Sequence, residues 1–260
     1  MSAGFHTKID ERNVATLTLA RAPLHNAFDE NLITELTAAC KALDDDRDVR
    51  VVILAGRGKS FSAGADLNWM KRMAAYDEAA NLKDAGALAE LMRVLDTCPK
   101  PTIARVQGAA LGGGTGLTAA CDIAVASTRA FFATSEVKFG IIPAVISPYV
   151  VRAIGPRAAR RYFLTAEVFD AAEAYRLGLV HVVDENLDAA VEALLVKLRA
   201  AGPKAIAETK ALIARVESGP VDDAMIADTA ARIARIRVSP EGREGIGAFL
   251  AKRKPGWTAS

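Results

Sequence analysis

The chain has 260 residues, of which 51% are hydrophobic and 25% charged, which is ordinary for a soluble protein with one main domain and an appendage. A formal net charge of +2 argues against a nucleic-acid-binding surface, and three cysteines without CxxC or histidine spacing indicate neither disulfides nor a zinc site. No apolar run approaches the roughly 18 to 20 residues of a membrane span, and residues 1–10 lack the features of a secretion signal, so we expect a cytoplasmic protein.

The first half of the chain alternates between strand and helix patterns, an order typical of α/β proteins. The predicted elements are a strand over residues 15–19, an amphipathic helix over 29–43, a buried strand over 51–54, a helix over 76–95 and a strand over 102–106. Asp29 is suited to cap the first helix, and Pro99 and Pro101 stop the second. We therefore expect strand–helix units that repeat around one core.

The second half continues this order and then becomes purely helical. Its predicted elements are strands over 123–126 and 131–133, helices over 146–154 and 156–164, and a last strand over 180–183. Helix breaks are predicted at residues 202–203, 219–220 and 239–240, each with a proline at the start of the next helix. We predict an α/β core over residues 1–195 and a helical region over residues 196–260, whose apolar face must pack against something.

Two glycine-bearing segments stand where a strand is predicted to run into a helix. They read FSAGADL over residues 61–67 and AALGGGTG over residues 109–116. Because glycine lacks Cβ, its backbone can approach a ligand closely and adopt positive φ without steric cost. Two N–H groups held about 3 Å from a thioester oxygen form an oxyanion hole, and a helix that starts at Gly113 adds its positive end. We predict Ala65 and Gly113 as these donors, although either segment alone also fits an ordinary turn.

The flanks of both segments resemble the enoyl-CoA hydratase/isomerase (crotonase) superfamily, from about Thr7 to Trp257. The other matching stretches are RAPLHNA at residues 21–27, PKPTIA at 99–104, CDIA at 121–124 and FGIIP at 139–143. Residues 61–71 and 146–155 are most similar to bacterial 3-methylglutaconyl-CoA hydratases. The second of these stretches differs from the glycine-rich run that typical hydratases carry after the proline.

The resemblance implies a fold, a substrate class and an assembly. The fold is a crotonase-like spiral of repeated ββα units with a C-terminal helical region that makes trimer contacts, and such trimers commonly pair into hexamers. The substrate is an acyl-CoA, with no separate cofactor. The CoA-binding residues that it implies are Ala27, Ala63, Ala65, Arg21, His25 and Lys252. Lys252 matches a lysine that meets the 3'-phosphate from a neighbouring part of the assembly, although a basic helix end also complements the helix dipole.

The same resemblance makes Glu136 the predicted catalytic residue. Typical hydratases use two glutamates around one water, and here the first position is Gly116 while the second is Glu136. As a base, Glu136 would activate water for attack on Cβ of a 2-enoyl thioester, and as an acid it would return a proton to Cα. We expect Phe139, Ile141 and Ile142 to form an apolar pocket that raises the pKa of Glu136.

The missing carboxylate at Gly116 leaves two activities open. A single base suits 3,2-enoyl isomerisation, in which one glutamate moves a proton between Cγ and Cα. Alternatively, Gly116 provides room for a substrate that carries its own carboxylate, such as 3-methylglutaconyl-CoA, and removes repulsion from a second glutamate. We favour this hydratase, with a possible place in leucine or isoprenoid breakdown. The cations considered for the substrate carboxylate are Lys71, Arg72, Lys138 and Arg152.

Other classes of function fit less well. A CoA-binding protein without catalysis, or an RNA-binding one, remains an alternative from another class. Retention of Glu136 argues against the first, and near-neutral charge argues weakly against the second. The histidines have no triad spacing, and no phosphate-loop or dinucleotide motif is present. Asp66 is interpreted as a helix cap rather than a catalytic acid.

Overall fold

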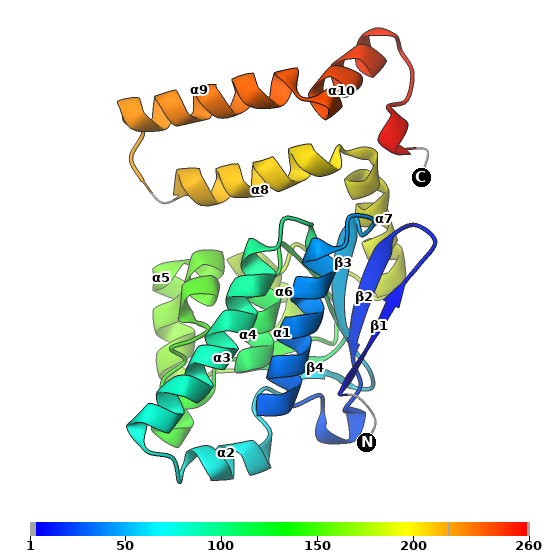
Figure 1. Cartoon of the computed structure of the whole chain (residues 1–260). Helices are drawn as coiled ribbons and strands as arrows, with labels where there is room; N and C mark the ends of the chain where they lie inside the picture. Colours follow the sequence, from blue (N-terminus) through cyan, green and yellow to red (C-terminus); the bar gives the residue numbers. More distant parts are fainter. Residues whose placement is uncertain (1–3, 218, 259–260) are drawn as a thin grey trace.

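The strands of the computed structural model form two sheets (Figure 1). It describes residues 4–217 and 219–258, so Met1 to Ala3, the start of the segment in which we expected no secretion signal, lie outside the described residues. The strands are β1 Phe5–Ile9, β2 Val14–Leu19, β3 Val51–Gly56, β4 Ser60–Ser62, β5 Thr102–Val106, β6 Ala109–Leu111, β7 Ile123–Ala126, β8 Phe131–Ala133, β9 Phe169–Asp170 and β10 Val182–Val183. One sheet has the order β1-β2-β3-β5-β7-β10 and the other β4-β6-β8-β9.

The helices follow the strands in a repeating order. They are α1 Glu30–Asp45, α2 Leu67–Met73, α3 Glu78–Thr97, α4 Gly113–Ala120, α5 Ser147–Thr165, α6 Ala171–Leu177, α7 Leu187–Ala200, α8 Pro203–Glu217, α9 Asp223–Val238 and α10 Pro240–Leu250, with 3-10 turns η1 Ala22–Leu24, η2 Glu136–Phe139 and η3 Gly256–Thr258. The pairs β3–β4, β5–β6 and β7–β8 each place their first strand in the larger sheet and their second in the smaller, and a helix follows each pair. This confirms the predicted spiral of ββα units.

Both faces of the larger sheet are covered because its central strands carry apolar side chains toward both sides. Leu17, Val52 and Leu54 pack with residues of α1 and α3, including Leu36 and Leu95. Successive side chains of a strand point to opposite faces. The intervening side chains Val14, Val51, Ile53, Ile103 and Val125 therefore pack against Leu187, Val191 and Leu195 of α7. The prediction that the strand around residue 52 is fully buried is confirmed.

Local signals placed the long helices well. The Asp29 carboxylate accepts a hydrogen bond from Leu32 N, as expected for the cap of α1. Gly155, at φ 74°, interrupts α5 where two helices were predicted. A strand-to-helix junction was expected at each glycine segment, but the bounds of the three-residue strands β4 and β6 and of the short helix α2 were not predicted, because these elements contain too few residues to show a periodicity.

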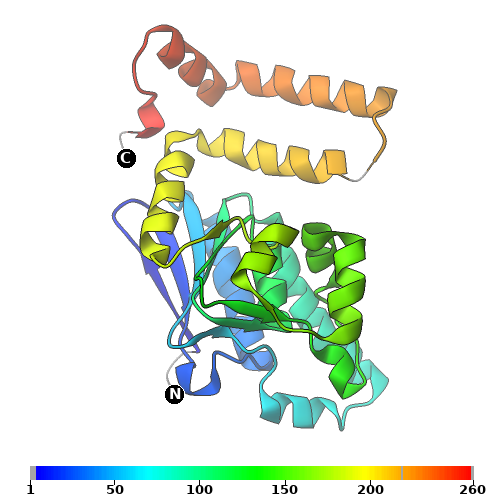
Figure 2. The same ribbon diagram turned by 180° about the vertical axis from the view of Figure 1, so that it is seen from behind.

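The C-terminal helices α8, α9 and α10 form a separate layer on one side of the α/β body (Figure 1), and α7 leads into them, as seen from behind in Figure 2. The predicted division after residue 195 falls inside α7, which belongs to the core of the larger sheet. The layer is tied to the body by polar contacts. Lys210 Nζ of α8 donates to Asp122 Oδ2 at 2.6 Å and to the carbonyl of Lys100 at 3.1 Å.

Asp122 is itself held in the body. Its Oδ2 also accepts hydrogen bonds from Thr102 N at 2.7 Å and Thr102 Oγ1 at 2.8 Å. Arg50 provides a second contact with this layer, since its Nη2 donates to the carbonyl of Ala201 at 2.9 Å.

Within the described ranges, no helix is both long enough and apolar enough to cross a membrane.

We predict that Lys210→Met weakens the attachment of α8. The substitution keeps the aliphatic stem but removes the charge partner of the half-buried Asp122, which should lower the free energy of unfolding by about 1–3 kcal/mol. Urea denaturation followed by circular dichroism measures this difference. Lys204→Met, at an exposed position of the same helix, is the matched control. Equal stability of the two variants would contradict the structural role of this contact.

Candidate active site

The two glycine segments lie directly against each other. A Cβ added at Gly64, where φ is 82°, would lie 2.7 Å from the carbonyl oxygen of Leu111. A Cβ added at Gly114 would overlap the carbonyl oxygen of Ser62. Glycine is required at both positions because the backbones approach more closely than any side chain allows. The structure therefore brings together the two loops that the sequence singled out.

Among the described residues, the N–H groups of Ala65 and Gly113 have no backbone carbonyl as partner. Phe28 N donates to Gly64 O at 2.8 Å and Asp66 N donates to Phe28 O at 3.0 Å, so the N–H of Ala65 points away from this bridge. Gly113 is the first residue of α4, and the first four N–H groups of a helix have no partner within it. Across the described part of the chain, neither group donates to another backbone carbonyl. Both are available to a ligand oxygen.

Glu136 faces the start of α4. It opens the turn η2 after β8, and a Cβ added at Gly112 would lie 3.2 Å from Glu136 Oε1. Gly112 has φ 51° and its N–H donates to Ala133 O at 2.8 Å, which joins the loop to β8. The carboxylate thus lies beside the glycine that precedes the helix and its free N–H groups.

The Glu136 carboxylate is partly buried. Glu136 Oε2 is buried and has no hydrogen-bond partner among the described residues. Burial raises the pKa of Glu136 above its ordinary value of 4.5, and a hydrogen bond from its own backbone opposes this only partly. A carboxylate with a raised pKa and an unused oxygen is suited to exchange protons with a ligand.

The prediction that Phe139, Ile141 and Ile142 form an apolar pocket around Glu136 is wrong. Phe139, Ile141 and Ile142 are 61%, 53% and 72% exposed. The turn η2 ends at Gly140 in the left-handed conformation, with φ 72°, and these side chains project from the surface of the chain. Burial raises the pKa of Glu136, while these three side chains remain largely exposed.

The room expected at Gly116 is also absent. Gly116 is buried in α4, and a Cβ added there would overlap Cγ2 of Ile146 and lie 2.8 Å from Ile146 Cβ and 3.1 Å from Met92 Cε. The space is filled by apolar atoms. The sequence did not predict a contact of Ile146 or Met92 with Gly116. For Ile146 a signal was available, because residues 146–155 differ from the glycine-rich run that typical hydratases carry after the proline.

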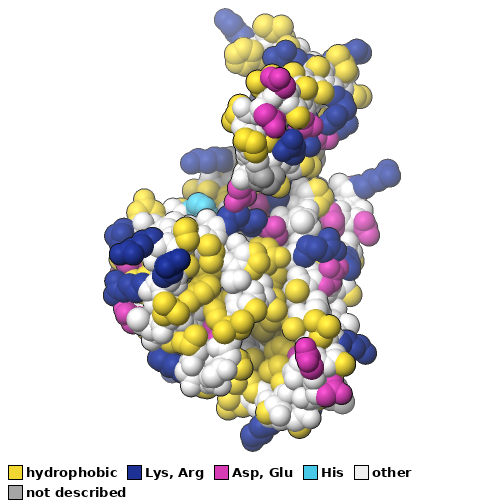
Figure 3. All heavy atoms as spheres, turned by 90° about the vertical axis from the view of Figure 1, so that its left-hand side faces the viewer, with side chains coloured by type: hydrophobic (Ala, Val, Ile, Leu, Met, Phe, Trp, Pro, Cys, Tyr) yellow, Lys and Arg dark blue, Asp and Glu magenta, His cyan; other side chains and the backbone are white. Residues whose placement is uncertain are grey.

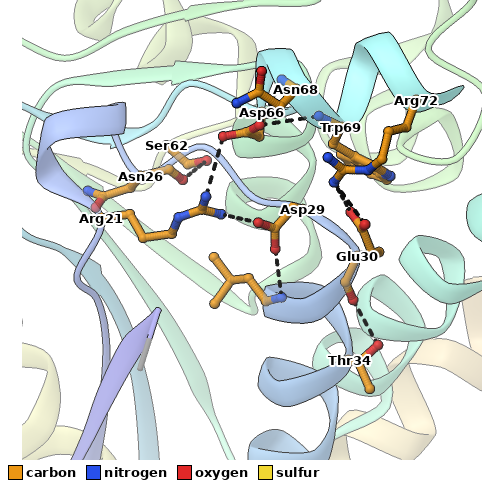
Figure 4. A network of polar contacts seen from close by, with 11 residues as sticks. Arg21, Asn26, Asp29, Glu30, Thr34, Ser62, Asp66, Asn68, Trp69 and Arg72 are labelled. Carbon is orange, nitrogen blue, oxygen red and sulfur yellow. Dashed lines mark hydrogen bonds and ion pairs between the residues drawn. The ribbon is translucent and has the colours of Figure 1, made fainter. Parts of the chain in front are cut away.

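One of the predicted CoA-binding residues, Arg21, belongs to a polar network at the start of α1 and α2 (Figure 4). Arg21 lies between Asp29 and Asp66, with Nη1 2.9 Å from Asp29 Oδ2 and Nη2 3.3 Å from Asp66 Oδ2. Asp66 caps α2 by accepting from Asn68 N and Trp69 N, which confirms its interpretation as a helix cap. The Arg21 guanidinium is therefore engaged within the fold, while His25 is exposed and its Nδ1 lies 3.0 Å from Ser60 Oγ.

The other predicted CoA-binding residues lie in two places. Ala63 N donates to His25 O at 2.9 Å, so the segment around Ala27 runs beside the one that holds Ala63 and Ala65. Buried Asn26, which the sequence reasoning did not identify, locks this junction by donating to the carbonyls of Arg57 and Ser60 at 2.8 Å. Lys252 follows α10 in the helical layer and is exposed.

The cations considered for a substrate carboxylate differ in availability. Arg72 pairs with Glu30 at 2.7 Å, and Arg152 pairs with Asp96. Lys71 and Lys138 are exposed, and the ion pairs of the described residues include neither. The part of the chain described here contains no group of three or more His, Cys, Asp or Glu side chains placed to hold a metal ion.

Comparisons with known proteins show the family to which this chain belongs. The family model for enoyl-CoA hydratase/isomerase matches residues 10–260. A crotonyl-CoA hydratase of Syntrophomonas wolfei is 34% identical over 249 residues, covering 94% of each chain. A solved enoyl-CoA hydratase of Shewanella pealeana is 48% identical, with a TM-score of 0.96 over 98% of this chain and 96% of that one. Pseudomonas aeruginosa AtuE is 39% identical, with a TM-score of 0.94 over 98% and 99%. The chain belongs to the enoyl-CoA hydratase/isomerase family.

Proposed function

We propose that this protein hydrates a 2-enoyl-CoA that carries a second carboxylate, of the 3-methylglutaconyl-CoA type. The observation that carries the proposal is the position of Glu136, whose carboxylate has one buried oxygen and lies beside Gly112, next to two segments that each leave one N–H group free, with no second carboxylate at Gly116. The hydratase names of its relatives support water addition. The similarity of residues 61–71 and 146–155 to glutaconyl-CoA hydratases supports the substrate class.

The reaction uses one carboxylate twice. Glu136 accepts a proton from water while the water oxygen bonds to Cβ, and the electron pair of the double bond moves toward the thioester. The thioester oxygen becomes negative and accepts hydrogen bonds from the N–H groups of Ala65 and Gly113. The protonated Glu136 then gives its proton to Cα, which regenerates the carboxylate and completes the addition of water.

A substrate with its own negative charge fits a site with a single carboxylate. Two carboxylates within about 4–6 Å repel each other, so a second glutamate would oppose binding of an acidic acyl group. Lys71 and Lys138 are the available partners for the substrate carboxylate, since Arg72 and Arg152 are already paired. The advantage of Gly116 is therefore electrostatic, because its space is filled.

One alternative reaction is favoured by a specific observation. Glycine stands at residue 116, where typical hydratases carry a second glutamate, and a lone base is what 3,2-enoyl isomerisation requires. In that reaction Glu136 would remove a proton from Cγ and return it to Cα without water. The product of hydration is heavier than its substrate by one water, whereas the product of isomerisation has the same mass as its substrate. Mass spectrometry therefore distinguishes the two reactions.

We also propose that the chain works as a homotrimer or a pair of trimers in the cytoplasm. Large hydrophobic side chains are exposed on α9 and α10, including Ile226, Phe249 and Leu250, and near the site at Ile142. Figure 3 shows hydrophobic side chains gathered over the α/β body on the side where α5 lies. Contacts between copies would cover such surfaces and bring Lys252 of one copy toward the CoA of another. Light scattering after gel filtration measures the mass.

Glu136→Gln is predicted to lower turnover by at least about a hundredfold while leaving CoA affinity near that of the wild type. Gln keeps the size of the side chain but cannot accept and return the proton. Steady-state assays with calorimetric titration of CoA separate the two effects. Full activity in this variant would remove Glu136 from the mechanism.

We predict that Glu136→Gln is more stable than the wild type by an amount that depends on pH. The folded state raises the pKa of Glu136 above 4.5, so the buried charge destabilises the fold at high pH and this penalty disappears as pH falls through the raised pKa toward 4.5. Glu136→Gln should therefore be more stable than the wild type at about pH 8 and show no such gain near the ordinary pKa. Thermal melts across this range test it; a constant difference would contradict the burial of a charged carboxylate.

Turnover of 3-methylglutaconyl-CoA, crotonyl-CoA and a 3-enoyl-CoA should differ, with products followed by mass. We expect water addition to the first at a kcat/KM at least about tenfold above that for crotonyl-CoA, a difference that one well-placed charge can supply. Conversion only of the 3-enoyl thioester without a gain in mass would establish the isomerase.

A further inference from the structure

The direction of a side chain at residue 116 follows from helix geometry. Gly116 lies three residues after Gly113 in α4, so the two share a face. Cα–Cβ bonds in a helix tilt toward its N-terminus. A side chain at 116 would therefore lean over the first turn of α4, toward Gly113 and Gly112, where Glu136 Oε1 lies.

Ile146 occupies the start of that path. The Cβ that residue 116 would need overlaps Ile146 Cγ2 and comes within 2.8 Å of Ile146 Cβ, an atom fixed to the backbone. Ile146 is 3% exposed, and its carbonyl accepts from Tyr149 N at 3.2 Å and Val150 N at 3.1 Å at the start of α5. Because the backbone is held by the helix start, Ile146 cannot move aside cheaply.

We propose that Ile146 is a specificity-determining residue: it fills the volume beside Gly116 and so keeps a second carboxylate out of a site whose substrate brings its own. The inference rests on the proposed function for the identity of that substrate. Its steric part stands on the overlap with Ile146 alone. Residues 116 and 146 form one pair in which only one position can carry a large side chain.

The steric part is tested by a double-mutant cycle with Gly116→Ala, Ile146→Ala and both together. Gly116→Ala should lower Tm by at least about 3 °C by overpacking, and Ile146→Ala should lower it by leaving a cavity. The double variant should lose clearly less than the sum, because the added methyl group occupies the space that Ile146 leaves. Additive losses would overturn the pairing.

The proposed role of Ile146 in specificity is tested with two matched double variants. One combines Gly116→Glu with Ile146→Ala, and the other combines Gly116→Gln with Ile146→Ala. They differ only in the charge at residue 116. We expect the Glu variant to raise the ratio of kcat/KM for crotonyl-CoA over 3-methylglutaconyl-CoA by at least about tenfold relative to the Gln variant. Its pH profile on crotonyl-CoA should also gain a second ionisation, which a purely structural effect would not produce.

The outcomes distinguish this inference from the proposed function. Equal ratios in the Glu and Gln variants, with the double-mutant cycle non-additive, would overturn the specificity role while leaving the hydratase intact. A wild-type protein that does not hydrate 3-methylglutaconyl-CoA would overturn the proposed function and the substrate part of the inference with it. The thermal cycle would still report whether Ile146 excludes a side chain at 116.

Discussion

The close approach of two backbone segments, residues 62–65 and 111–114, is the contact on which the site depends. Gly64 and Gly114 allow it, since a Cβ at either would meet a carbonyl oxygen of the opposite segment. This contact brings the segment of Ala65 against the start of α4, and among residues 4–217 and 219–258 the N–H groups of Ala65 and Gly113 have no backbone carbonyl as partner. The ββα repeat supplies the support, because β4, β6 and β8 are neighbours in one sheet and deliver both loops and Glu136 to one edge.

The two N–H donors and the Glu136 base require different surroundings. N–H groups that bind an oxyanion must be free and must stay fixed, which the fold provides through a helix start and a strand-like bridge. A carboxylate that moves protons must be partly dry, and Glu136 keeps one oxygen buried and unpaired. Both groups lower the stability of the empty chain, so they are expected only where a ligand uses them. Their proximity is a stronger sign of function than either feature alone.

Much of this could be predicted from the sequence because the signals are local. The cap at Asp29, the prolines after α3 and the glycines of both loops each act within a few residues. What could not be predicted depends on tertiary packing. The overlap of Ile146 with Gly116 joins residues thirty positions apart, and the exposure of Phe139 follows from the left-handed turn at Gly140. The sequence therefore predicted residues that the structure brings together, but not the side chains that pack around them.

The pairing of Gly116 with Ile146 has a consequence for the order in which substitutions can be introduced into this chain. A glutamate at residue 116 overlaps the isoleucine at residue 146. The order of the two substitutions therefore matters. The residue at 146 must become small first, and a chain with two small residues must survive the intermediate cavity. The reverse change leaves a similar cavity until a large side chain fills position 146, so the effect of a substitution at either position depends on the residue at the other.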